Sequence, residues 1–106
     1  MKFTTLFIAH VPDADPTKDS TIMETDLYKL HVKFVSTKKE AFFIVKELRD
    51  EVELHSIILC PGFSNEDVGE MSSLVDEKVG ISVARGDGKS SEIAREAMEK
   101  VGWFEE

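Results

Sequence analysis

The chain has 106 residues, of which 42% are hydrophobic and 32% are charged, an ordinary balance for a globular protein. This length fits one domain, so we expect residues 1–106 to form a single domain. The formal charge of −8 disfavours nucleic acid and anionic membrane surfaces as partners, since both attract basic proteins. The single cysteine excludes an internal disulfide and a cysteine-built zinc site.

The first segment, MKFTTLFIAH, combines one lysine with a short apolar run, and no small-residue cleavage site follows it. It therefore predicts a strand rather than a signal peptide. No apolar stretch approaches the ~20 residues that span a bilayer. With a lone thiol and no export signal, we expect a cytoplasmic protein that does not bind membranes.

The first half of the chain predicts two strands separated by a long loop. Residues 2–9 (KFTTLFIA) are aromatic and β-branched, which predicts a strand buried on both faces. The acidic stretch 11–27 follows as a loop, and an Asp-Pro pair within it could start a short helix over 16–24. Residues 28–35 alternate in polarity, which predicts a half-buried strand at a sheet edge. Its apolar row is Tyr28, Leu30, Val32 and Phe34, and its polar row is Lys29, His31 and Lys33.

The second half alternates helices with strands. Thr37 and Glu40 form a T-x-x-E capping box, which predicts a helix over about 38–50. Residues 56–60 (SIILC) are apolar throughout, as is typical of a central parallel strand.

A second helix, a fourth strand and a third, last helix complete the predicted pattern. Ser64 can cap a second helix that ends near Gly80, and residues 81–85 (ISVAR) predict a fourth strand. Gly102 fits the left-handed position that follows a helix. The apolar stripe of this last helix consists of Ile93, Ala94, Ala97, Met98 and Val101.

Strands that alternate with helices favour a parallel sheet with right-handed crossovers. We therefore predict an α/β fold: a small three-layer sandwich with a four-stranded, mostly parallel sheet and three main helices. The simplest strand order is 2-1-3-4, a reduced flavodoxin-like arrangement. A split β-α-β arrangement of the ferredoxin kind is the alternative, and it fits less well because only one strand shows a polar face.

Open parallel sheets bind ligands beyond the carboxyl ends of their strands, where the strand order reverses. In the order 2-1-3-4 this point lies between His10 and Cys60, which end the first and third strands. A thiol beside a helix N-terminus and an arginine is activated as a nucleophile. One hypothesis is therefore Cys60 as nucleophile, His10 as base and Arg85 as anion clamp. The alternative is structural, with Cys60 packed as a small apolar residue and His10 bonded to the backbone.

The turn before the last helix is the most distinctive segment. Its glycines allow a close backbone approach, and the helix start offers unpaired N–H groups that suit a phosphate or carboxylate. Walker and dinucleotide motifs fail on glycine spacing, and a plain tight turn is the alternative. We expect neither a metal nor a cofactor, since the histidines lack metal-ligand spacing. The residues predicted to bind an anion are Arg85, Gly86, Asp87, Gly88, Ser90, Ser91 and Gly62.

Three stretches, MKFTTLFIAHVPDADP, CPGF (Cys60 to Phe63) and ARGDG (Ala84 to Gly88), occur in this order in a chain of this length. Together they resemble a family of small prokaryotic proteins of unknown function. The resemblance covers nearly the whole chain and implies a single domain. It implies no reaction and assigns no role to Cys60 or Arg85.

Two classes of function therefore stay open. The first is a small-molecule binding protein or thiol-dependent enzyme that takes a small anionic metabolite. The second is a non-catalytic assembly or regulatory module that forms a homo-oligomer through an open strand edge or through Trp103 and Phe104. A solvent-reachable, reactive Cys60 is expected of the first class, and an inert thiol of the second.

Overall fold

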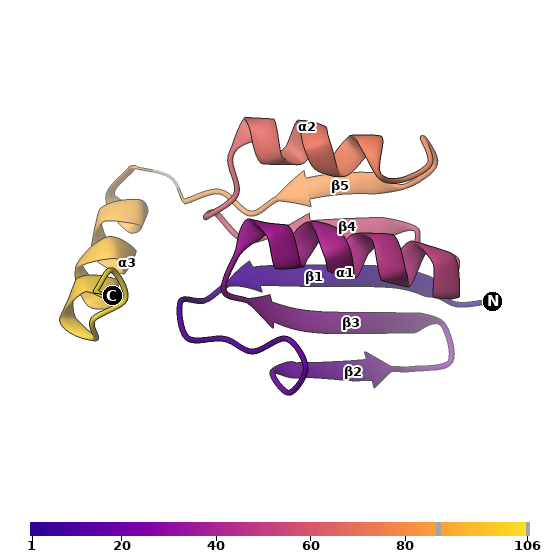
Figure 1. The fold of residues 1–106 in the computed structure, drawn as a ribbon, viewed down its shortest axis with the longest axis horizontal. Coiled ribbons are helices and arrows are strands. Elements are labelled where there is room, and N and C mark those ends of the chain that lie inside the picture. The colour runs from indigo at the N-terminus through magenta and orange to yellow at the C-terminus, as the bar shows by residue number, and fades with distance from the viewer. Residues whose placement is uncertain (87, 106) are drawn as a thin grey trace.

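A five-stranded sheet with two helices packed on one face forms the body of the computed structural model, which describes residues 1–86 and 88–105 (Figure 1). The third helix projects from the end of the sheet where β1, β3, β4 and β5 finish. The elements in chain order are β1 (Phe3–His10), β2 (Ser20–Glu24), β3 (Tyr28–Val35), α1 (Lys38–Glu51), β4 (Ser56–Leu59), α2 (Asn65–Ser73), β5 (Gly80–Val83) and α3 (Gly88–Lys100).

The strand order is β2-β3-β1-β4-β5, in which β2 runs antiparallel to β3 and the other pairs are parallel. The prediction of a mixed α/β fold with a mostly parallel sheet and three helices is confirmed. The prediction of four strands is wrong because β2 adds a fifth strand outside β3. For the same reason, β3 is not the edge strand that its alternating polarity predicted.

The predicted short helix over 16–24 is also wrong. The Asp15 carboxylate accepts hydrogen bonds from the backbone N–H and the hydroxyl of Thr17, at 3.0 and 2.7 Å, and the Asp15 carbonyl accepts from Asp19 N–H. These bonds close a tight turn, after which the β-branched residues of β2 pair with β3. The second helix ends at Ser73, well before Gly80, which begins β5.

The apolar core lies on one face of the sheet, beneath α1 and α2. Because side chains alternate along a strand, cross-strand partners share a face. The strand residues buried in the core therefore belong to one face, which we call the helix face. They are Leu6, Ile8, Val35, Ile57 and Leu59, and they pack with Ala41, Ile44, Val45, Leu48, Phe63 and Met71 of the helices and loops.

The opposite face, which we call the open face, has neither α1 nor α2 on it. The described α3, Gly88–Lys100, buries none of its residues, so it does not cover this face either. The expected three-layer sandwich is therefore wrong for one chain, which forms two layers. The open face carries Phe3, Thr5, Phe7, Ala9, Thr21, Met23, Tyr28, Leu30, Val32, Phe34, Ser56, Ile58, Gly80 and Ser82.

The connections explain this one-sidedness. The crossovers through α1 and α2 both move along the sheet from the β3 side toward β5, so a right-handed path places both helices on the same face. A helix on the other face needs a connection that moves the opposite way. The step from β1 to β3 moves that way, and the chain makes it through β2 instead of a helix.

Candidate functional site

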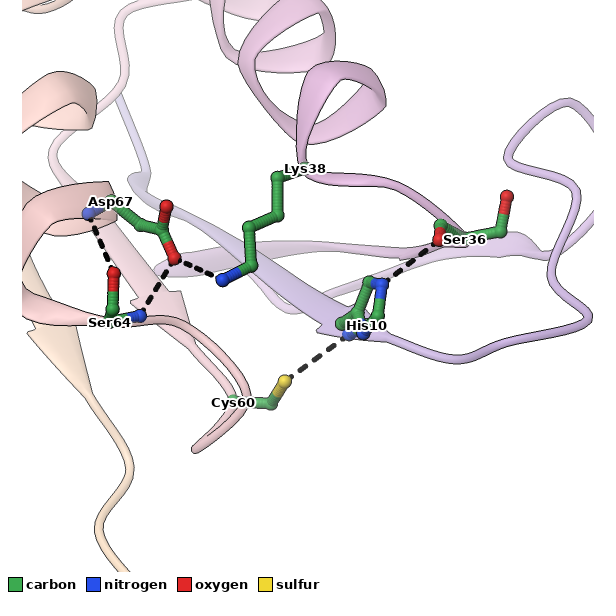
Figure 2. Close-up of polar contacts among 6 residues, drawn as sticks. All are labelled: His10, Ser36, Lys38, Cys60, Ser64 and Asp67. Carbon is green, nitrogen blue, oxygen red and sulfur yellow. Dashed lines mark hydrogen bonds and ion pairs between the residues drawn. The ribbon is translucent and has the colours of Figure 1, made fainter. Parts of the chain in front are cut away.

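His10 and Cys60 lie together at the carboxyl ends of β1 and β4, as the strand order predicted (Figure 2). Gly62 lies beside both of them. The Cys60 N–H donates to the Ile8 carbonyl at 3.1 Å, which continues the pairing of the two strands. The His10 backbone N–H then donates to the Cys60 Sγ at 3.2 Å. A Cβ added at Gly62 would lie 3.5 Å from that sulfur, an ordinary contact distance.

The His10 ring is engaged elsewhere. Its Nε2 lies 2.9 Å from the Ser36 carbonyl oxygen, which can only accept, so Nε2 carries the proton in this contact. The hydrogen bond between His10 and Cys60 involves the His10 backbone rather than its imidazole (Figure 2). Among residues 1–86 and 88–105, the thiol is partly buried and has no side-chain base hydrogen-bonded to it.

A second polar group joins the first turns of α1 and α2 beside this cluster. The Lys38 Nζ contacts Asp67 Oδ2 at 2.5 Å, and the same oxygen accepts the Ser64 N–H at 2.8 Å (Figure 2). Burial raises the pKa of the Asp67 carboxyl, but the hydrogen bonds from Lys38 and Ser64 outweigh burial and hold it below its ordinary value. Lys38 also lies 5.9 Å from the centre of the Phe63 ring.

Sequence reasoning missed Lys38, because its partner stands in another helix. The helix starts themselves were predictable. Both contain complete capping boxes, formed by Thr37 with Glu40 and by Ser64 with Asp67.

The same capping boxes place a carboxylate at each of the two helix starts. The Glu40 Oε1 accepts the N–H groups of Ser36 and Thr37 and the Ser36 hydroxyl, at 2.8 to 3.1 Å. The hydrogen bond from the Ser36 backbone is the main reason why the pKa of Glu40 lies below its ordinary value. An incoming phosphate would therefore meet the negative charge of a carboxylate at each start, which opposes its binding there.

The predicted anion-binding turn lies between β5 and α3, apart from the starts of α1 and α2. Ala84 N–H donates to the Leu59 carbonyl at 2.8 Å, so the chain leaves β5 at the carboxyl edge, and exposed Arg85 follows. Asp87 lies outside the described residues. Gly86 packs against Ser91, where an added Cβ would come within 3.3 Å of the hydroxyl. The other predicted residues, Gly88, Ser90 and Ser91, are exposed on the first turn of the projecting α3 (Figure 1).

Two hollows occur elsewhere on the surface. One, of about 500 Å³, lies at the opposite end of the sheet, between the end of α1 and the starts of β4 and β5. The other, of about 330 Å³, lies between Pro16 and α1. Neither is lined by His10, Cys60 or the turn that begins α3.

The described residues show neither a metal-binding cluster nor a membrane-spanning helix. Within residues 1–86 and 88–105, no three His, Cys, Asp or Glu side chains gather closely enough to hold a metal ion. Over the same residues, no helix combines the length and the apolar character needed to cross a membrane.

Fold and site together define a small α/β protein with helices on one face of its sheet and with two helix starts that are each capped by a carboxylate. The chain belongs to DUF6506, a family of unknown function, whose model matches residues 3–99. This confirms the resemblance to a family of unknown function. No curated protein and no solved structure matches the chain.

Proposed function

We propose that this protein is a non-catalytic assembly module that forms a homo-oligomer through the open face of its sheet. One observation carries the proposal: the open face is apolar and uncovered. Among the strand residues described on that face, none is charged. Large uncovered apolar patches are typical of interaction surfaces.

The exposure of the large side chains on the open face gives the proposal its physical basis. Phe3, Met23 and Phe34 are 53%, 66% and 39% exposed, and Phe7, Tyr28, Leu30, Val32 and Ile58 are half-buried. Burying a fully exposed side chain of this kind contributes about 1.5–3 kcal/mol, so covering one that is already half-buried contributes roughly half as much. A contact that covers several of them would therefore offset the free-energy cost of association.

The alternating polarity of β3 also supports an interaction surface on the open face. Its apolar row lies on the open face, while its polar row lies on the helix face, where His31 is only 6% exposed. A half-buried strand in a monomer keeps its apolar row toward the core and its polar row toward water. The reversed arrangement in β3 is expected where the apolar row meets another surface.

Light scattering coupled to size-exclusion chromatography tests the proposal. We expect the protein to be an oligomer, and we expect Phe34→Lys to reduce it to a monomer. Phe43→Lys is the matched control, because Phe43 is 61% exposed on α1 and lies away from the open face. A monomeric native chain, or an oligomer that survives Phe34→Lys, would overturn the proposal.

A second candidate, thiol chemistry at the carboxyl edge with a small anionic metabolite, is favoured by one observation. Cys60 is partly accessible and meets His10 and Gly62 at that edge. Alkylation of the folded protein tests it, since every signal belongs to Cys60. Rapid labelling that phosphate slows would support thiol chemistry beside an anion site, whereas labelling only after denaturation would eliminate it.

A further inference from the structure

Helix α3 is an amphipathic helix whose apolar side is not buried by any other helix or strand among the described residues. Its apolar residues Ile93, Ala94, Ala97, Met98 and Val101 fall on one side at helical spacing, and its charged residues fall on the other. Ile93 and Val101 are 61% and 76% exposed. The described α3 residues include none that is buried.

An isolated helix of this length needs tertiary support. The 13 residues of α3 are close to the length at which helices are marginal in water, and its first turn contains no acidic residue. Its end is nevertheless well formed: Gly102 has a φ of +80°, Gly102 N–H donates to Glu99, and Trp103 N–H donates to the Met98 carbonyl. A helix with a defined end and an uncovered apolar side is expected to pack on another surface.

The open face matches α3 in character and in length. Thirteen helical residues span about 20 Å, and the eight residues of β3 span about 26 Å. The apolar side of α3 can therefore lie along the strands of an uncharged face, with its charged side toward water. Neither surface has another partner among the described residues of this chain.

Geometry favours a second copy as the partner of α3. Most of the large apolar side chains of the open face lie on β2, β3 and β1, whereas its β4 and β5 half carries Ile58 beside Ser56, Gly80 and Ser82. Because α3 follows β5, the three strand spacings from β5 to β3 place the apolar half roughly 14 Å to the side. Instead of turning back over the sheet, α3 projects beyond its carboxyl edge (Figure 1). The radius of gyration of 14.4 Å exceeds the ~13 Å usual for this length.

We propose that α3 of one copy covers the apolar half of the open face of a second copy, and that the exchange is reciprocal. This inference rests on the proposed function and names the contact that forms the oligomer. Reciprocal exchange gives a closed dimer with two equal contacts. Each sheet then gains the second helical layer that its own chain does not supply.

Cross-linking tests which chain supplies the helix. The variant carries Val32→Cys and Met98→Cys in a Cys60→Ser background and is treated with a short bismaleimide. We expect a covalent dimer on a denaturing gel. A cross-link within one chain would mean that α3 covers its own sheet, and no cross-link would mean that α3 does not cover the face; either result overturns the inference. Lys46→Cys with Met98→Cys in the same Cys60→Ser background is the control and should give no cross-linked dimer, since Lys46 is exposed on α1, away from the open face.

Substitutions on α3 separate this inference from the proposed function. We expect Ile93→Gln to raise the dimer dissociation constant by about 100-fold, because each dimer loses the side chain at two symmetric sites. Glu96→Gln, on the charged side of the same helix, should leave the constant unchanged. An oligomer that is lost with Phe34→Lys but unaffected by Ile93→Gln would overturn the α3 contact alone. A native chain that is monomeric would overturn both.

Discussion

The ammonium of Lys38 lies 2.5 Å from a carboxylate oxygen of Asp67, a contact that joins the first turns of α1 and α2 across 29 positions of sequence. Asp67 also caps its own helix, so one carboxylate serves both a helix start and an interhelical ion pair. The two helices are thereby fixed to each other directly above the end of the sheet where His10 and Cys60 meet (Figure 2).

Removing the ammonium should therefore weaken the pairing of the helices. We expect Lys38→Met to lower the free energy of unfolding by about 0.5–1 kcal/mol, the range of a partly exposed ion pair. Lys39→Met is the control, since Lys39 is exposed in the same turn and has no recorded ion pair with Asp67. Urea unfolding at pH 7 gives both values, and equal losses in the two variants would contradict the prediction.

Acid should destabilise the protein through the same carboxylate. The pKa of Asp67 is lowered in the folded state, so the unfolded chain takes up its proton first as the pH falls. The stability that Asp67 contributes is present above the ordinary aspartate pKa of about 3.9 and is lost as the pH falls through the folded value. Unfolding measured from pH 6 to pH 2 should show a smaller loss for Asp67→Asn than for the native chain. Parallel curves would refute this assignment.

His31 should produce a second pH dependence at a higher pH. Burial lowers the pKa of His31, and the nearby Lys29 and Lys33 lower it further. Below about pH 6.5 His31 is protonated in the unfolded chain but not in the folded chain. The free energy of unfolding therefore decreases as the pH is lowered, until the pH reaches the folded pKa of His31. His31→Leu should remove this decline.

The same substitution should also stabilise the protein above that range. The Nε2 of His31 is the buried side-chain polar atom without a partner among the described residues. Leaving such a group unsatisfied costs about 1–3 kcal/mol, so we expect His31→Leu to raise the free energy of unfolding at pH 8. A destabilised His31→Leu would contradict the prediction and would mean that the imidazole is satisfied in the folded protein.

Two glycines should respond oppositely to alanine. Gly69 lies within α2, where an added Cβ meets nothing within 4 Å, so Gly69→Ala should stabilise the protein by about 0.5–1 kcal/mol. Gly102 has a φ of +80°, which alanine adopts only with strain, so Gly102→Ala should weaken the end of α3. Thermal unfolding and helical circular dichroism distinguish the two, and a stabilising Gly102→Ala would contradict the left-handed cap.

Local signals in the sequence predicted the elements that depend on local chemistry. The capping residues Thr37 and Ser64 marked both helix starts, and Gly102 marked the end of α3. The strand β2 was missed because it is short and exposed along its whole length, and its strand pairing depends on β3 rather than on its own pattern. The Asp-Pro pair before it gave a local helix signal that the Asp15 turn overrides.

The part of the candidate site that depends on strand order alone was predictable from the sequence. His10 and Cys60 meet because the neighbouring strands β1 and β4 end side by side. The Gly86–Ser91 turn was expected at the same place because β5 also ends there, but it opens a helix that leaves the sheet. Whether a helix packs back onto its own sheet depends on the sheet surface available to it. The residues that form this surface lie far away in sequence, so local patterns do not predict the packing.

The strand β2, at five residues, occupies the place in the chain where a crossover helix would have completed the second layer of the sheet. On the arrangement proposed above, folding and association are one equilibrium, since the subunit is finished only when its neighbour arrives. The melting temperature should then rise with protein concentration, as it does for obligate dimers. A newly synthesised chain would therefore stay folded only where the concentration of other copies is high enough for dimers to form.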